Sequence, residues 1–381
     1  MTVTVRSFAK INLGLYIGGA RPDGFHDLRT VYQTVALHDI ICVQVGRGTG
    51  IEIHCEDARV PKDQTNTCYR VAERAMAALR ARGRVTITIE KRLPVQGGLG
   101  AGSGNAVATL LALERALKKK LPGAEKLRIA AEVGSDLPLF LVGGTALGGG
   151  RGEEVYPLPD LPSTHCVVVT PEIGVSTPAA FADWDAMMAR GPRETGDREG
   201  RVWEGHDFSG AKADPYKGAA LATGKPAELR SARTGQRAVP TQSGEGATVS
   251  KLTLQLPSDR MLEFGRAVSA WLSGQPLSGV PVSKGRGRAE TPLLDLVRTG
   301  IENDFEQVVF PQYPALREVK RGLERAGAVY ASLSGSGSAT YGLFGSREAA
   351  ERAAARLRKD GTPATATTTL TRPQYWKKIF D

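Results

Sequence analysis

The residues best suited to chemistry lie between positions 93 and 120, where the chain runs LPVQGGLGAGSGNAVATLLALERALKKK. Closely spaced glycines let the backbone approach an anion. The helix that opens near Ser103 directs unpaired amide groups and the positive end of its dipole toward the same point. This combination predicts a phosphate site. Ser103 has two interpretations of equal weight: an N-cap of the helix, or a ligand of phosphate or of a magnesium-bound water.

Two regular elements are expected to position this loop. Val85, Ile87 and Ile89 alternate with polar residues, as in a half-buried strand, and the segment after the loop favours a helix to about Lys120. The expected order is therefore strand, loop, helix. A Walker loop, a dinucleotide fingerprint and the protein-kinase signatures are all missing from the sequence. The predicted site must belong to another class of phosphate-binding protein.

Composition limits the class of protein. The 381 residues, 41% hydrophobic and 24% charged, are typical of a globular protein with about two domains. The sequence lacks a secretion-signal pattern and a run of about 18 apolar residues, so we expect a cytoplasmic protein with no membrane partner. The formal net charge of +10 favours nucleotides and other anions as ligands. Because the basic residues are spread out, the charge argues against nucleic acid as a partner.

Other segments indicate further elements. The four cysteines, at positions 42, 55, 68 and 166, have neither metal-ligand nor disulfide spacing, so buried free thiols are expected. Helices are predicted over 67–82, 124–133 and 177–188, and the last part of the chain predicts helix, strand, glycine turn, strand, helix and strand. From about 190 to 250 small and charged residues dominate, which predicts a flexible insertion.

Three segments together resemble the signature motifs of the GHMP kinases. They are SFAKINLGLYIGGARPDGFHDLRT near the N-terminus, LPVQGGLGAGSGNAVATL in the middle and LSGSGSATYGLF near the C-terminus. The resemblance covers about residues 1–181 in order and resumes in the last quarter of the chain. It implies an α+β two-domain fold. An ATP-binding domain over 1–160 would resemble ribosomal protein S5 domain 2, and an α+β, ferredoxin-like domain over 161–381 would contain the insertion.

The resemblance also implies ATP as co-substrate and Mg²⁺ as cofactor. The family holds ATP phosphates on the stretch that matches the first glycine loop, and a second glycine turn closes over the same region. The magnesium ligands stay unassigned. The implied ATP-binding residues are Pro94, Val95, Gln96, Gly97, Gly98, Leu99, Gly100, Ala101, Gly102, Ser103, Gly104, Gly335, Ser336 and Gly337.

Two charged residues gain a role only through the resemblance. Asp136 by itself organises a turn before Pro138, and Lys10 by itself is a surface residue of a strand. The family pattern places at Asp136 the carboxylate that accepts the proton of the substrate hydroxyl. It places at Lys10 a cation that keeps the carboxylate ionised and meets the migrating phosphoryl group. For a loose transition state, Asp136 is either a true base or an orienting group, and both alternatives stay open.

The segments DGFH, GSDLPLFLVGGTALGGGRGE and PEIGVSTPAAF resemble those GHMP kinases that phosphorylate the 2-hydroxyl of 4-diphosphocytidyl-2-C-methyl-D-erythritol in the non-mevalonate isoprenoid pathway. In that group two aromatic rings sandwich the cytosine, and a histidine recognises its edge. Core packing is the alternative for both Phe25 and Phe181, and Asn12 could hold either the substrate polyol or Asp136. The implied substrate-binding residues are Asn12, Phe25, His26, Thr177 and Phe181.

Two other functions are compatible with these patterns. Another GHMP small-molecule kinase, of the homoserine or mevalonate type, would keep the ATP loop and ignore cytosine. A basic nucleic-acid-binding module would bind RNA with a steep dependence on salt and would not turn over ATP. The expected partner is a small-molecule substrate, and the expected assembly is a monomer or a weak homodimer.

Overall fold

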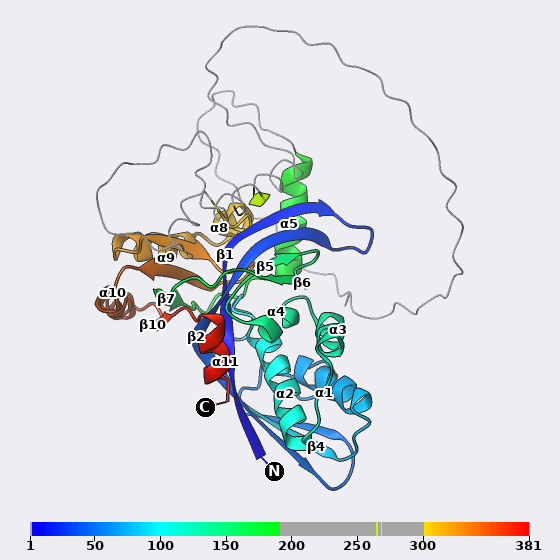
Figure 1. Ribbon diagram of the computed structural model, residues 1–381. Helices are drawn as coiled ribbons and strands as arrows, with labels where there is room; N and C mark the ends of the chain where they lie inside the picture. The colour runs from blue at the N-terminus through cyan, green and yellow to red at the C-terminus, as the bar shows by residue number, and fades with distance from the viewer. Residues whose placement is uncertain (1, 191–263, 266–267, 269–300, 381) are drawn as a thin grey trace, which may run out of the picture. The chain divides into compact units, whose positions relative to one another are not determined.

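The computed structural model describes residues 2–190, 264–265, 268 and 301–380. From residue 191 onward, the predicted insertion lies outside these described residues. Two sheets organise the described chain, and separate groups of helices pack on them (Figure 1). The predicted domain boundary at residue 160 falls between the last strand of the first sheet and the first strand of the second, and it stays a prediction.

The first sheet is built on two long strands, β1 and β2, which pair antiparallel along almost their whole length. Its strand order is β3-β4-β2-β5-β6, with β1 also paired to β2, and β3 and β4 run parallel. In β4 the alternate residues Val85, Ile87 and Ile89 are buried, so the half-buried strand predicted there is confirmed. The strands are β1 (Thr2–Ala20), β2 (His26–Gly46), β3 (Ile51–Cys55), β4 (Arg84–Glu90), β5 (Thr145–Gly149) and β6 (Glu154–Pro157).

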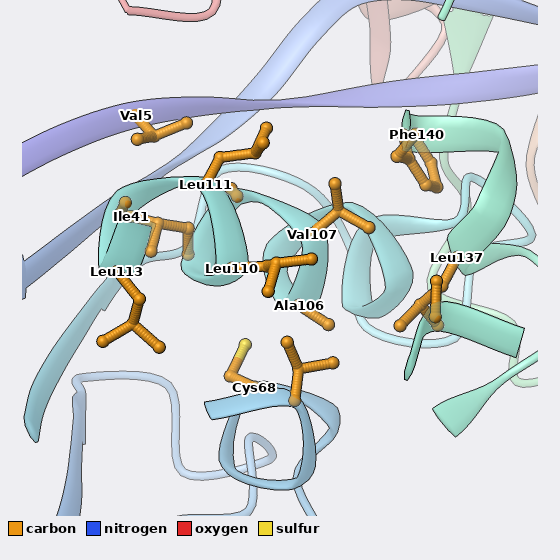
Figure 2. Close-up of a cluster of buried hydrophobic side chains, with 14 of the residues drawn as sticks. Val5, Ile41, Cys68, Ala106, Val107, Leu110, Leu111, Leu113, Leu137 and Phe140 are labelled. Carbon is orange, nitrogen blue, oxygen red and sulfur yellow. The ribbon is translucent and has the colours of Figure 1, made fainter. Parts of the chain in front are cut away.

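Helices pack on the sheet face that carries the buried side chains of β4, and α2 lies at the centre of this core. Figure 2 shows Leu111 of α2 beside Val5 of β1, and Cys68 of α1 below Ala106. An alanine- and leucine-rich sequence favours this helix, and burial of each large apolar side chain contributes about 1.5–3 kcal/mol. The helices of this layer are α1 (Thr67–Ala78), α2 (Ala101–Leu117), α3 (Gly123–Val133) and α4 (Leu137–Val142).

The second sheet is antiparallel, in the order β10-β7-β9-β8. Its apolar face packs against alanines and leucines of α9 and α10, while α5 and α8 share a smaller core with the end of β1. The strands are β7 (His165–Val169), β8 (Tyr330–Leu333), β9 (Thr340–Phe344) and β10 (Ala364–Thr368). The helices beside this sheet are α5 (Thr177–Ala189), α8 (Glu306–Gln312), α9 (Pro314–Arg325) and α10 (Arg347–Lys359). The last helix, α11 (Arg372–Lys378), returns to the first core, where Tyr375 is buried.

Most predicted elements are confirmed, with differences at their ends. The helix after the glycine loop ends at Leu117 because Lys118 adopts the left-handed region, with φ of 51°. The helix predicted over 67–82 ends at Ala78, and Arg80 also has a positive φ. Helix α11 was not predicted from the sequence, although Thr371 and Gln374 form a capping box at its start. The cysteines are free as expected; three are buried and Cys42 is half-buried.

Candidate active site

The glycine loop connects β4 to α2 through a backbone that only glycine adopts easily at two positions. Gly98 and Gly100 have φ of +80° and +67°. A Cβ on Gly98 would collide with the backbone oxygen of Ser334, and one on Gly100 would lie 3.0 Å from Cγ of Lys10. Gly100 is the N-cap of α2, which excludes the N-cap interpretation of Ser103. Ser103 instead lies in the first turn of the helix.

A cavity of about 350 Å³ opens beside this loop. Residues 94–103, which the family resemblance implies as ATP-binding positions, line this cavity. Gly104 lies outside the lining: a Cβ there would be 2.9 Å from the backbone oxygen of Phe8 and from Oγ of Ser7, so this position faces β1. The structure therefore does not bring Gly104 to the cavity.

A second group of residues that line the cavity was not predicted from the sequence. It includes the start of α1, where the side chain of Asn66 caps the helix by accepting from the backbone N–H of Cys68 at 2.8 Å. The expected helix start at Thr67 was a usable signal, because a second helix N-terminus beside a phosphate loop adds further amide donors. The missed lining residues are Val60, Pro61, Thr65, Asn66, Thr67, Cys68, Ile89, Lys91 and Asn105.

A buried carboxylate, Asp39 of β2, holds the segment that enters the loop. Its Oδ1 accepts the backbone N–H groups of Arg92 and Leu93 at 2.7 and 2.8 Å. Its Oδ2 accepts from Nζ of Lys91 at 2.6 Å and from Nδ2 of Asn105 at 3.0 Å. Asp39 and Lys91 are both buried. The start of the glycine loop and the helix after it are thus connected to one side chain of the sheet.

The second glycine turn contacts the first, as the sequence analysis expected. Oγ of Ser334 donates to the backbone oxygen of Gly98 at 3.0 Å, and the N–H of Ala339 donates to the backbone oxygen of Gly97 at 2.9 Å. A Cβ on Gly337 would collide with the backbone of Gly97 and Gly98. Two segments far apart in the sequence therefore build one continuous backbone surface.

Lys10 and Asp136 meet directly beside this surface. Nζ of Lys10 lies 3.4 Å from Oδ2 of Asp136, and their side chains are 4% and 31% exposed. Lys10 is therefore buried, so the surface interpretation is wrong. Asp136 precedes α4, and its side chain makes no capping hydrogen bond within the described residues; it faces Lys10 and the hydroxyl of Tyr32 at 3.1 Å. The side chain of Asn12 accepts from Nζ of Lys10 at 2.7 Å, so it orients this ammonium.

The residues predicted to bind cytosine gather near α5. The rings of His26 and Phe181 stack, with centroids 4.8 Å apart and planes 13° apart. Nε2 of His26 lies 2.7 Å from Oδ1 of Asp185. Phe25 is 42% exposed, so core packing does not explain it, and the guanidinium of Arg151 lies 4.9 Å from its ring centroid. In this structure His26 therefore stacks on Phe181, and Arg151 lies over the ring of Phe25.

Thr177, the remaining predicted substrate residue, contacts the second glycine turn. Its Oγ1 lies 2.7 Å from Oγ of Ser336. Because Thr177 is the first residue of α5, this contact connects the helix that carries Phe181 to the turn that contacts the ATP loop. The predicted ATP-binding and substrate-binding groups are therefore neighbours in space.

Comparisons with known proteins find similar sequences along most of the chain. The family model "GHMP kinases N terminal domain" matches residues 66–144, and "GHMP kinases C terminal" matches residues 290–362. A 4-diphosphocytidyl-2-C-methyl-D-erythritol kinase from Solibacter usitatus (strain Ellin6076) is 34% identical over 358 residues, which cover 94% of this chain and 86% of the relative. A protein of the same name from Acaryochloris marina (strain MBIC 11017) is 31% identical over 356 residues, 93% of this chain and 91% of the relative.

A solved structure agrees with both relatives. The crystal structure of a 4-(cytidine 5'-diphospho)-2C-methyl-D-erythritol kinase superposes with a TM-score of 0.60 at 26% identity and covers 96% of this chain and 98% of that one. The chain therefore belongs to the GHMP kinases and, among them, to the family of 4-diphosphocytidyl-2-C-methyl-D-erythritol kinases. The expected two-domain fold of mixed helix and sheet is confirmed, and membership in a kinase family makes ATP the co-substrate.

Proposed function

We propose that this chain transfers the γ-phosphoryl group of ATP to the 2-hydroxyl of 4-diphosphocytidyl-2-C-methyl-D-erythritol. The observation that carries the proposal is the ion pair of the buried Lys10 and the half-buried Asp136 beside the two glycine turns. A Cβ on Gly335 would lie 3.4 Å from Nζ of Lys10, and the backbone N–H of Lys10 donates to the oxygen of Leu99 at 2.9 Å. A carboxylate, an ammonium and a phosphate-binding backbone thus surround one point, as phosphoryl transfer requires.

ATP binding uses the cavity and the loop. The nucleoside occupies the cavity between the start of α1 and the loop, and the phosphates lie on the backbone N–H groups at the start of α2. Mg²⁺ keeps most of its waters and binds chiefly through substrate phosphates. The hydroxyl of Ser103, in the first turn of α2, would hold phosphate or a water of such an ion, which would neutralise phosphate charge. Among the described residues no group of three or more His, Cys, Asp or Glu side chains could hold a metal ion.

Asp136 and Lys10 act on the acceptor. Asp136 accepts a hydrogen bond from the 2-hydroxyl and orients its oxygen toward the γ-phosphorus. As the new O–P bond forms and the bond to the ADP oxygen breaks, the hydroxyl proton passes to this carboxylate. The ammonium of Lys10, 3.4 Å from this carboxylate, lies where it can stabilise negative charge on the transferred group.

Substrate selection depends on the groups near α5. Phe25 and Phe181 offer ring faces to the cytosine once Arg151 and His26 give up their present stacking positions. Stacking of a base on an aromatic ring contributes about 1–3 kcal/mol. His26 recognises the cytosine edge, and Asn12 and Thr177 complete the polyol end of the pocket.

The test is a coupled assay of ADP release with the purified full chain, MgATP and the cytidine substrate. Asp136→Asn keeps the shape of the side chain and removes its charge, so we expect a loss of at least about 100-fold in kcat. Glu125→Gln changes a carboxylate at the surface of α3 and serves as the control. Faster turnover of homoserine or mevalonate would support the other kinase types. Salt-sensitive RNA binding without ATP turnover would support the nucleic-acid module.

Location and assembly are two further expectations. A cytoplasmic location stays a prediction, which cell fractionation would test; the described helices include none with the length and apolar character of a membrane span. A monomeric or weakly dimeric assembly also stays a prediction, which sedimentation would test.

A further inference from the structure

Two glycines, one in β5 and one after it, make room for a buried tyrosine. Tyr32 of β2 is 2% exposed and belongs to the core under α2 and α4. A Cβ on Gly148 would collide with its ring, and a Cβ on Gly152 would lie 2.7 Å from its hydroxyl oxygen. Gly148 and Gly152 therefore have a structural reason that the ATP site does not supply, namely access of the Tyr32 hydroxyl to the carboxylate of Asp136.

The hydroxyl of Tyr32 completes a closed group of three side chains. It donates to Oδ1 of Asp136 at 3.1 Å, while the other carboxylate oxygen faces Nζ of Lys10 at 3.4 Å. The same ammonium lies 5.6 Å from the centroid of the Tyr32 ring. The backbone oxygen of Gly152, at 3.4 Å, is a second and more distant acceptor for the hydroxyl. Each oxygen of Asp136 thus has a different partner.

The charges around Tyr32 keep it a donor. Burial, together with the carboxylates of Asp136 and Glu153, raises the pKa of the Tyr32 hydroxyl well above its ordinary value. The facing charged groups are Lys10 on β1, Asp136 before α4, and Glu153 before β6, whose carboxylate also binds Arg151 at 3.1 Å. Tyr32 therefore stays protonated throughout the working pH range and cannot serve as the base.

We propose that Tyr32 is a positioning residue for phosphoryl transfer, whose hydroxyl orients the carboxylate of Asp136. This inference rests on the role of Asp136 in the proposed function. A donor bound to Oδ1 stops rotation of the carboxylate and leaves the Oδ2 side, next to Lys10, for the reacting hydroxyl. Loss of the donor would leave the carboxylate less well oriented.

Tyr32→Phe in the full chain removes the hydroxyl and keeps the ring. We expect kcat to fall about 10-fold, with the KM values for ATP and for the cytidine substrate within about 2-fold of wild type. The fall is confined to kcat because the carboxylate is less well oriented, while the surfaces that bind the two substrates are unchanged. Tyr375→Phe is the matched control: it also removes a buried hydroxyl, one that donates to the backbone oxygen of Phe140 at 2.7 Å.

The carboxyl ¹³C chemical shift of Asp136 gives a readout that does not depend on activity. We expect this resonance to move in Tyr32→Phe and to stay in place in Tyr375→Phe, because only the first variant removes a hydrogen bond to this carboxylate. If wild type fails to phosphorylate the cytidine substrate, the proposed function fails, and this chemical shift still tests the contact of Tyr32. An unchanged resonance and an unchanged kcat in a folded Tyr32→Phe protein would overturn the inference.

A second variant covers the case in which Tyr32→Phe does not fold. Gly152→Ala leaves Tyr32 in place and pushes a methyl group toward its hydroxyl. The same fall in kcat and a change of the Asp136 resonance are expected. A folded Gly152→Ala protein with wild-type kinetics and a wild-type Asp136 resonance would count against the inference.

Discussion

Asp39→Asn is the sharpest test of how the glycine loop is held. The variant keeps the size of the side chain but turns one acceptor into a donor. If the amide nitrogen replaces Oδ1, it meets the N–H groups of Arg92 and Leu93; if it replaces Oδ2, it meets Lys91 and Asn105. Asn105 can rotate its own amide to present oxygen, but the ammonium of Lys91 has only donors. The least costly arrangement therefore leaves a buried ammonium facing an amide group.

The magnitude follows from this unpaired charge. Removing one partner of a buried ion pair costs about 3–5 kcal/mol, and we take about 3 because the introduced amide keeps one acceptor oxygen. With an unfolding entropy of about 2.1 cal/mol/K for each of the 272 residues that the structure describes, Tm should fall by about 5 °C. The KM for ATP should rise with it, because Arg92 and Leu93 carry the start of the loop.

Thermal and urea unfolding of the variant, with ATP kinetics in parallel, measure both effects. Glu318→Gln, at an exposed ion pair of α9, should change Tm by less than about 1 °C. The double variant Asp39→Asn/Lys91→Met removes the unpaired ammonium and should be more stable than Asp39→Asn alone. A double variant no more stable than the single one, or Asp39→Asn indistinguishable from Glu318→Gln, would refute this reasoning.

Three other results are expected. Gly98→Ala places a Cβ against a backbone oxygen at a positive φ, so it should raise the KM for ATP at least 10-fold. Gly345→Ala is the control, because open space surrounds Gly345. Equal KM values for the two variants would contradict the close approach of the two turns. Phe25→Ala should raise the KM for the cytidine substrate about 5- to 150-fold with Tm unchanged, as the loss of one stacking face requires; an unchanged KM would remove Phe25 from the site. At pH 8, iodoacetamide should leave Cys68 and Cys166 unmodified in the native protein. Burial raises the pKa of each thiol to about 12, so the thiolate fraction is about 10⁻⁴. Rapid labelling seen by mass spectrometry would contradict the burial of these thiols.

The sequence predicted those parts of the site that are continuous in the chain. The strand, loop and helix around Gly98 follow from local periodicity, and resemblance marked Lys10 and Asp136. Asp39 and Tyr32 could not be found this way, because their roles depend on which strands and loops lie beside β2. Nothing in the local sequence says that residue 39 meets residues 91–93.

Other differences have equally physical causes. Gly104 belongs to the same glycine run as Gly98, but the α2 helix has begun by then and directs position 104 toward β1. His26 and Phe181 were expected as separate contacts to cytosine, whereas the structure stacks one on the other. Such a contact joins residues from β2 and α5, and periodicity within either element does not contain it.

The contact of Ser334 with Gly98 has a consequence for synthesis of the protein. The two residues are 236 positions apart, so a ribosome adding about 5–20 residues per second needs roughly 10–50 s to reach the second after the first. During that interval the nascent chain carries the glycine loop without the turn that contacts it. A ligand stabilises a fold only in proportion to its affinity for the completed site. The cavity beside the loop is lined by residues 60–105 alone, so ATP would stabilise the early half of the chain less than the complete protein, and the core under α2 carries most of the stability of that half.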